Sequence, residues 1–301
     1  MKLRHFLIRT LVIAALATTA LTASADSLGP TLDRISERGM VFLGHREASV
    51  PFSYLPAGQN EPDGFSVEIC RHVIKAIEEK LGKKLAVQPV PMTPNSRIMM
   101  VKTGMADMEC GTTTNTVGRS QQVAFSITFF VSEVKAMVPV ALAGKSLKDL
   151  ANKRVVSATG TTSDRLIKQA SMTRNVSVRS LARRNNERAM DALVQGEADI
   201  FVADDAILIG LRAQSESPEN YVLLDEAYSS EPYGLILPKD DPQFKQLVDE
   251  VLIGLMKSGQ IEKIYNAWFM SPIPPNDRNL NYPMSPLNKA AYANPNDKSV
   301  N

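Results

Sequence analysis

Apolar positions divide the chain into alternating helical and strand segments. The clearest helical pattern runs from Phe65 to Leu81, where apolar residues recur about every 3.6 positions and charged residues occupy the other face. Helices are also predicted from Thr31 to Arg38 and from Pro242 to near Gly259. Short apolar runs between helices predict buried strands at Val41–Leu43, Val87–Val90, Met105–Cys110, Ala136–Val140 and Arg154–Ala158. This alternation predicts an α/β fold.

Both ends of the chain depart from this pattern. Lys2, Arg4 and Arg9 precede an apolar run from Leu11 to Ala17, and the small residues Ala23-Ser24-Ala25 follow it. This order predicts a secretory signal peptide over 1–25. A membrane span needs about 20 apolar residues, and no later stretch supplies them. We therefore expect an exported, periplasmic protein without an anchor of its own. Beyond Phe269, a tail that runs extended across the surface is predicted from Pro272, Pro274, Pro275, Pro283 and Pro286.

One internal repeat predicts two similarly built halves. Gly104-Met-Ala-Asp and Gly196-Glu-Ala-Asp each follow a helix and open a strand, and each delivers a polar residue eight positions after its glycine. Those residues are Thr112 and Asp204. Because open α/β sheets bind ligands at the carboxyl ends of their strands, we expect both residues at a binding site.

Two polar stretches have the composition of an anion site. Glu109–Arg119 sets the hydroxyls of Thr112 and Thr114 and the planar cation of Arg119 directly after a buried strand. Gly160–Asp164 leads from a strand into a helix start, where unpaired N–H groups favour an anion. The alternatives are a threonine-rich turn with a solvated arginine, and an ordinary helix cap by Thr162 or Ser163.

Composition excludes several classes of function. Without residues 1–25 the chain keeps 31 basic against 32 acidic side chains, so we expect no nucleic-acid partner. It contains no H-x-x-x-H, C-x-x-C or G-x-S-x-G motif, and we expect no metal, cofactor or catalytic residue. Cys70 and Cys110 would be able to pair in an oxidising compartment, but Cys70 also suits a free buried thiol in a helix stripe.

Several motifs together resemble the periplasmic solute-binding proteins of ABC importers, in the polar amino-acid family, and most closely its glutamate- and aspartate-binding members. The motifs are at Gly44–Tyr54, Glu109–Arg119, Gly160–Asp164, Asp204–Ala206, Lys239–Lys245 and Ser271–Pro275. The resemblance implies two α/β lobes joined by two crossing strands, with 28–131 plus 230–301 in lobe 1 and 132–229 in lobe 2. It also implies a monomer that delivers its ligand to a membrane permease.

The resemblance also implies how the groups common to all amino acids are held. It implies that the α-carboxylate of the ligand binds Arg119 and nearby threonines, while Asp204 takes the α-ammonium. These threonines are Thr112, Thr114, Thr161 and Thr162.

The side-chain pocket is implied in the same way. Arg46 and Arg97 lie there by resemblance, and cations at these positions fit only an anionic ligand side chain. The chain departs from the glutamate- and aspartate-binding members at Asn186, where they have a histidine, and at Thr112, where they have a serine.

Two alternatives remain from the sequence. Some proteins of this fold resemble dehydratases of prephenate-like acids, whose carboxylates would also suit Arg46 and Arg119, although Asp204 suits an ammonium that prephenate lacks. The other alternative is a sensor that presents its closed lobes to a receptor.

Overall fold

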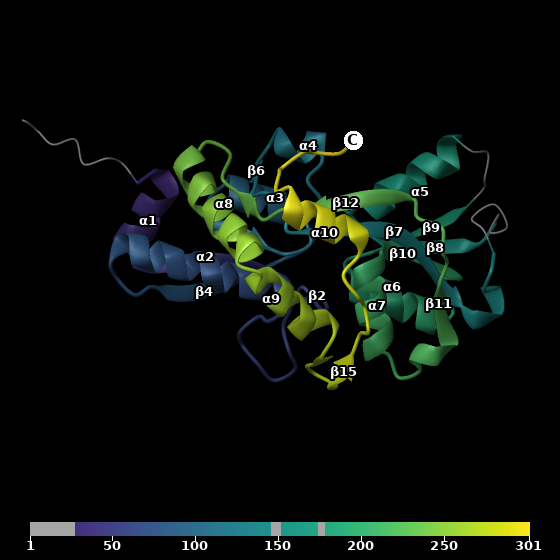
Figure 1. The fold of residues 1–301 in the computed structure, drawn as a ribbon. Helices are drawn as coiled ribbons and strands as arrows, with labels where there is room; N and C mark the ends of the chain where they lie inside the picture. Colours follow the sequence, from purple (N-terminus) through teal and green to yellow (C-terminus); the bar gives the residue numbers. More distant parts are fainter. Residues whose placement is uncertain (1–27, 146–151, 174–177) are drawn as a thin grey trace, which may run out of the picture.

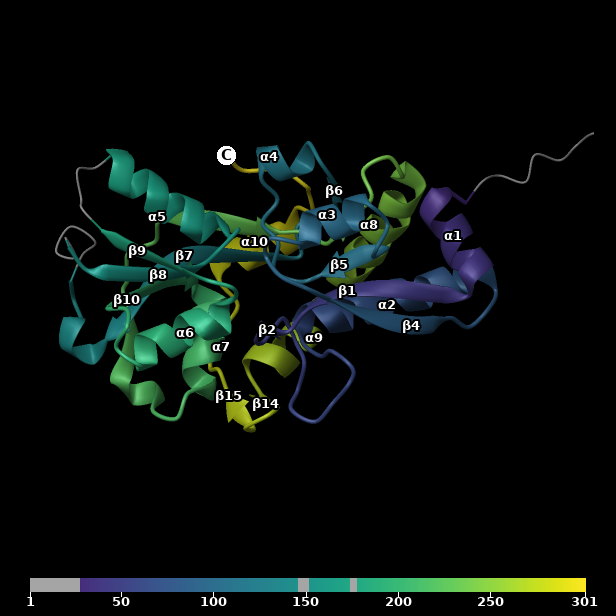
Figure 2. The same ribbon diagram turned by 180° about the vertical axis from the view of Figure 1, so that it is seen from behind.

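The computed structural model describes residues 28–145, 152–173 and 178–301. Its elements form two lobes, each with a central sheet flanked by helices (Figures 1 and 2). The α/β prediction is therefore confirmed. The predicted signal peptide over 1–25 lies outside the described residues.

The first lobe contains a five-stranded sheet in the order β4-β1-β5-β13-β6. β1 runs parallel to β4 and β5, whereas β13 is antiparallel to β5 and β6. The strands are β1 (Met40–Arg46), β4 (Ala86–Met92), β5 (Met108–Cys110), β6 (Ala124–Phe125) and β13 (Ile236–Leu237). The helices of this lobe are α1 (Pro30–Arg38), α2 (Phe65–Leu81), α3 (Arg97–Lys102), α4 (Val117–Ser120), α8 (Pro242–Lys257) and α9 (Gln260–Phe269).

The second lobe has a six-stranded sheet built around β7 and β10. Its order is β11-β7-β10-β8-β9, with β12 also paired to β7. The strands are β7 (Phe130–Pro139), β8 (Arg154–Ala158), β9 (Arg179–Arg183), β10 (Ile200–Asp204), β11 (Tyr221–Leu223) and β12 (Ser229–Tyr233). The helices are α5 (Thr162–Thr173), α6 (Asn186–Val194) and α7 (Asp205–Gln214), with 3-10 turns η1 (Val140–Leu142) and η3 (Pro218–Asn220).

Two short hairpins lie outside the two main sheets. They are made by β2 (Ala48–Ser49) with β3 (Ser53–Tyr54), and by β14 (Pro272–Ile273) with β15 (Arg278–Asn279).

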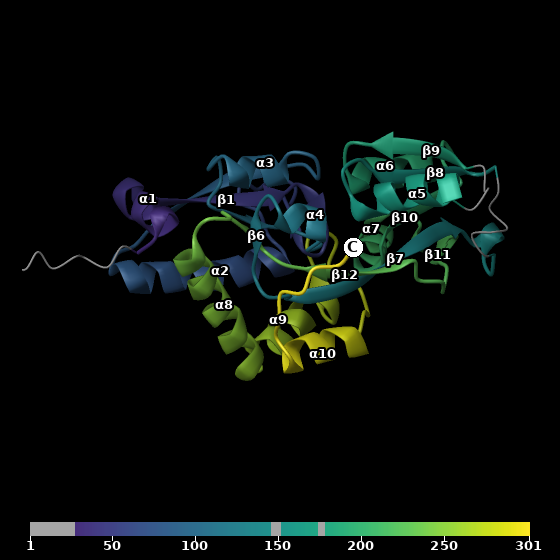
Figure 3. The same cartoon turned by 90° about the horizontal axis from the view of Figure 1, so that it is seen from above.

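Strands β7 and β12 are the two crossing strands between the lobes (Figure 3). The first half of β7 pairs with β12, and its second half pairs with β10 in the second lobe. The sequence prediction began this strand at Ala136, six residues too late. Polar residues at Ser132 and Glu133 interrupt the apolar run, although Ser132 is fully buried in the structure.

Aromatic packing anchors the crossing strands in the first lobe. The Phe130 ring of β7 lies 4.8 Å from Phe52, 5.8 Å from Tyr233 of β12 and 5.4 Å from Phe269, measured between centroids. All four side chains are fully buried. Such aromatic contacts contribute about 0.5–1.5 kcal/mol per pair beyond burial, so the crossing strands emerge from a rigid base.

The helix predictions are largely confirmed. α2 has the predicted bounds, and its buried side includes Phe65, Ile69 and Val73. Asp241 caps α8 by accepting from the Phe244 N–H at 2.9 Å, and its other oxygen accepts from the Thr31 N–H at 2.7 Å. One side chain therefore fixes the starts of two helices.

The prediction of an extended tail was wrong over part of its length. α10 (Pro286–Ala293) is a helix, with Pro286 in its first turn and the Ser285 hydroxyl accepting from the Asn288 N–H. The Asn288 amide bonds both backbone groups of Val131 on β7, at 2.7 and 3.1 Å. Proline is well tolerated at a helix start, where its missing N–H would have no helical partner.

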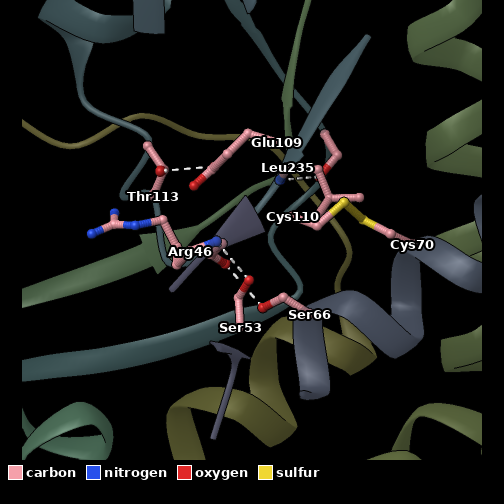
Figure 4. The surroundings of a disulfide bond; sticks show 10 residues. Arg46, Ser53, Ser66, Cys70, Glu109, Cys110, Thr113 and Leu235 are labelled. Carbon is pink, nitrogen blue, oxygen red and sulfur yellow. Dashed lines mark hydrogen bonds between the residues drawn. A yellow bond between two sulfur atoms is a disulfide. The ribbon is translucent and has the colours of Figure 1, made fainter. Parts of the chain in front are cut away.

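Cys70 and Cys110 form a disulfide that links α2 to the end of β5. The sequence left this pairing open. Both cysteines are fully buried, and Cys110 lies two residues before Thr112 (Figure 4). The disulfide therefore tethers the strand end that carries one of the predicted site residues.

Replacing both cysteines by serine should lower the free energy of unfolding by about 2–4 kcal/mol, because the bond closes a 40-residue separation in the unfolded chain. Urea unfolding of the variant and the oxidised wild type measures the difference. The wild type unfolded with a reductant serves as a control. Equal stability of oxidised wild type and variant would contradict this role.

Candidate functional site

Strand ends and helix starts from both lobes meet at one small cavity. It brings together seven of the nine predicted ligand-binding residues, and three that were not predicted. The lining residues are Arg46, Arg97, Thr112, Thr161, Thr162, Ser163, Asn186, Ala203, Asp204 and Ile207. The cavity therefore lies where the repeat predicted a site, at the ends of corresponding strands.

Two buried arginines supply the positive charge of the cavity. Arg46 is the last residue of β1 and Arg97 the first of α3, and they are 3% and 2% exposed. Their Nε groups have no hydrogen-bond partner. Among the described residues, neither guanidinium takes part in an ion pair. Burying an unpaired charge is unfavourable, so this arrangement is suited to an anion that enters the cavity.

Burial lowers the pKa of both guanidinium groups. For Arg46, desolvation and the neighbouring charge of Arg97 lower the pKa to about 9, against an opposing effect of Glu109. For Arg97, burial lowers the pKa while Glu109 and Asp204 act in the opposite direction. A pKa of about 9 leaves Arg46 charged at neutral pH.

Glu109 of β5 lies behind the arginines as a fully buried carboxylate. It accepts from the Thr113 hydroxyl at 3.0 Å, and its Oε1 has no hydrogen-bond partner (Figure 4). A Cβ on Gly111 would lie 2.0 Å from that Oε1 and 3.0 Å from Cγ of Arg46. Only glycine fits there, and it allows the buried acid to approach Arg46.

Three helix starts from the second lobe face the cavity. Thr162 is the first residue of α5, Asn186 is the first of α6, and Asp204 precedes α7. Thr161 caps α5 by accepting from the Asp164 N–H at 3.1 Å, so the cap is one residue earlier than predicted. Unpaired N–H groups and the helix dipoles give these ends a positive potential, which adds to that of the arginines.

Asp204 is the acid of the cavity and is 8% exposed. Its Oδ2 accepts a short hydrogen bond from the Tyr233 hydroxyl, and its Oδ1 accepts from Ser163 at 3.5 Å. Burial and the nearby Glu231 raise the pKa of Asp204 to about 7, against the hydrogen bond from Tyr233. A carboxylate has about four acceptor positions, so capacity for a further donor remains.

Thr114 and Arg119 do not line the cavity. The Thr114 hydroxyl donates to Glu231 at 2.7 Å, and the Arg119 guanidinium donates to the backbone oxygens of Thr114 and Gly160. Arg119 instead borders a second hollow between α4 and α5. Their predicted contact with an α-carboxylate stays a prediction.

Sequence reasoning missed Ser163, Ala203 and Ile207 as lining residues. Ser163 belongs to the Gly160–Asp164 motif, and Ala203 adjoins Asp204, so both were next to the predicted residues. Ile207 lies in the first turn of α7. A helix predicted to start at Asp205 would have identified Ile207 as a neighbour of Asp204 at the cavity. Over the described residues, no group of three or more histidines, cysteines or acids is arranged to hold a metal.

Residues 41–271 match the family of bacterial extracellular solute-binding proteins, family 3. The chain belongs to this family. The matched range includes every residue that lines the cavity.

Similar proteins cover nearly the whole chain. The "glutamate/aspartate import solute-binding protein" of Escherichia coli is 39% identical, over 96% of this chain and 97% of that protein. The "L-glutamate/L-aspartate-binding protein" of Pseudomonas aeruginosa is 36% identical, over 100% of this chain and 99% of that protein. A solved arginine-binding protein of T. maritima, a P235GK mutant, shares 25% identity with a TM-score of 0.70, over 79% of this chain and 98% of that chain.

The chain is therefore a solute-binding protein with the two-lobe fold of this family, as the sequence predicted. It is not an enzyme, because the family and these relatives are binding proteins. The dehydratase alternative is not supported. No helix among the described residues is long and apolar enough to span a membrane.

The raised pKa of Asp204 gives a test of its surroundings. The folded protein binds this proton more tightly than the unfolded chain, so unfolding free energy should fall as pH rises from about 4 to about 7. Between pH 5 and 8, the wild type should lose about 2 kcal/mol relative to Asp204→Asn, which cannot titrate. Urea unfolding at both values measures this. If the difference in unfolding free energy between the wild type and Asp204→Asn does not change with pH, the pKa of Asp204 is not raised by the fold.

Proposed function

We propose that this chain captures L-glutamate or L-aspartate between its lobes and delivers it to the membrane permease of an ABC importer. The observation that carries the proposal is the pair of buried arginines without a carboxylate partner. An acidic ligand supplies the missing negative charge, whereas a basic or neutral side chain leaves two buried cations unpaired. The names of the Escherichia coli and Pseudomonas aeruginosa relatives support the same ligands.

We assign the distal carboxylate of the ligand to Arg46 and Arg97, with Asn186 beside them at the start of α6. Both arginines present N–H groups that no described protein acceptor uses. Two cations facing one carboxylate form charge-assisted hydrogen bonds, which are about twice as strong as neutral ones. This assignment makes the arginines the source of selectivity.

The groups common to all amino acids fall to the remaining polar residues. We assign the α-carboxylate to Arg119, Thr112, Thr114, Thr161 and Thr162, because a planar guanidinium, hydroxyls and the N-terminus of α5 favour an anion. Asp204 takes the α-ammonium. That contact favours the ionised acid and lowers the pKa of Asp204 when the ligand binds.

The proposal also covers the bounds of the two lobes, the export of the chain and its oligomeric state. We propose lobe bounds of 28–131 plus 230–301 and 132–229, which cut the chain near the start of β7 and of β12. We also propose removal of 1–25 on export to the periplasm. We propose in addition that the chain works as a monomer.

Calorimetry with purified protein tests the ligand directly. L-glutamate or L-aspartate should bind one per chain, because three arginines and one aspartate match two carboxylates and one ammonium. The same titration should be run with the other common amino acids. Tight binding of lysine or histidine, without binding of either acid, would contradict the proposal.

Arg46→Met tests the source of selectivity, since it removes the charge but keeps much of the volume. Glutamate and aspartate should bind at least about 30-fold more weakly, which corresponds to about 2 kcal/mol for a buried unpaired carboxylate. Binding of glutamine or asparagine should change little. The ratio of acid to amide affinity, from calorimetry, should therefore shrink.

Arg71→Met is a matched control, because Arg71 is half exposed and pairs with Asp63 on the surface of the first lobe. It should leave all affinities unchanged. If Arg46→Met weakens the binding of acids and of amides by the same factor, Arg46 does not bind the distal carboxylate.

A further inference from the structure

Glu109 is a fully buried acid that lies outside the set of cavity-lining residues. Its Oε2 accepts from the Thr113 hydroxyl at 3.0 Å, and its Oε1 has no hydrogen-bond partner. Burying a carboxylate with so few donors costs free energy. An uncharged acceptor would hold Thr113 at a lower cost, so the charge itself calls for a role.

The carboxylate lies against the side chain of Arg46. In the parallel pairing of β1 with β5, Gly44 is opposite Glu109, and Arg46 is two residues further along β1. Alternate residues of a strand share a face of the sheet, so Arg46 and Glu109 lie on the same face. The close approach of both side chains to Gly111 agrees with this placement (Figure 4).

The charge of Glu109 reaches both arginines of the cavity. Burial lowers the pKa of Arg97, and Glu109 exerts the largest effect in the opposite direction. Burial and the charge of Arg97 lower the pKa of Arg46, and Glu109 again opposes them most strongly. One acid therefore acts on two cations without forming an ion pair with either, within the described residues.

The other ionisable groups near the arginines do not change this balance. His45 is neutral at pH 7, because burial lowers its pKa, and Tyr233 is neutral because burial raises its pKa. The Glu47 side chain is 43% exposed and pairs with Arg184 at 3.3 Å, so its charge is screened. Asp204 is assigned to the α-ammonium. Two positive charges and one negative charge then face the distal group of the ligand.

We infer that Glu109 determines specificity by reducing the charge around the distal group to one positive unit, which matches a ligand side chain with a single negative charge. The inference rests on the proposed function, in which Arg46 and Arg97 bind the distal carboxylate. A monoanionic group neutralises the pocket, whereas an amide leaves one buried cation uncompensated and a dianion adds an excess negative charge. Glu109 acts from behind the arginines and does not touch the ligand.

Glu109→Gln tests this role, because glutamine keeps the size and is still able to accept from Thr113. Calorimetry should compare L-glutamate with L-glutamine, which have nearly the same shape. Glutamate should bind about 10-fold or more tightly to the variant, since a buried repulsive charge is removed. Glutamine binding should change little, so the ratio of acid to amide affinity rises.

This result is the opposite of the one expected for Arg46→Met. A merely structural role for Glu109 would weaken both ligands by the same factor. An acid-to-amide ratio that stays unchanged or falls in Glu109→Gln would overturn the inference.

Glu47→Gln is a matched control, because it makes the same change in net charge next to Arg46. The Glu47 charge is exposed to solvent, so the variant should change both affinities by less than about threefold. A comparable rise of the ratio in both variants would show a general effect of net charge and would overturn a specific role for Glu109.

A measurement on the wild type does not depend on how the variant folds. L-serine O-sulfate and O-phospho-L-serine have nearly the same shape, but at about pH 8 their side chains carry one and two negative charges, since the second phosphate pKa is about 6. The wild type should bind the sulfate about 10-fold or more tightly at this pH. Equal affinities there would overturn the inference.

The preference for the sulfate should largely disappear at about pH 5, where the phosphate carries mostly one charge. Titration of Asp204 affects both esters equally, because their α-groups are the same. A preference of the same size at both pH values would show selection by shape and would overturn the inference. A wild type that binds neither glutamate nor aspartate would contradict the proposed function instead.

Discussion

The structure depends on two positive charges held inside the protein. Arg46 and Arg97 are almost fully buried, and removing such charges from water without compensation costs several kcal/mol. Glu109 and Asp204 lie in the same interior region and offset part of this cost. Neither of these acids forms an ion pair with either arginine within the described chain. The remaining positive potential is what makes the cavity selective for an anion.

The fold places these charges where the two lobes meet. β1 and α3 carry the arginines in the first lobe, while α5, α6 and β10 bring hydroxyl, amide and carboxylate groups from the second. Phe130 and Tyr233 anchor the crossing strands in the first-lobe core. Tyr233 also donates its hydroxyl to Asp204, so one side chain connects the aromatic core, the crossing strand and the cavity.

The sequence predicted the fold class and most cavity residues because short motifs sit directly at strand ends and helix starts. Thr112 and Asp204 were found from the repeat alone. The start of β7 at Phe130 was missed, since a buried polar residue such as Ser132 breaks the apolar pattern. The contacts of Arg119 were also beyond the sequence, because they join segments about 40 residues apart through backbone atoms that any residue would supply. Local sequence motifs thus identify the residues of a binding site more readily than the hydrogen-bond acceptors that a long side chain reaches.

The most direct test of the account is a crystal structure of the protein grown with L-glutamate. The distal carboxylate should lie between the guanidinium groups of Arg46 and Arg97, with the α-ammonium on Asp204. A distal carboxylate that points away from both arginines would contradict the account, because the buried charges would then have no ligand partner.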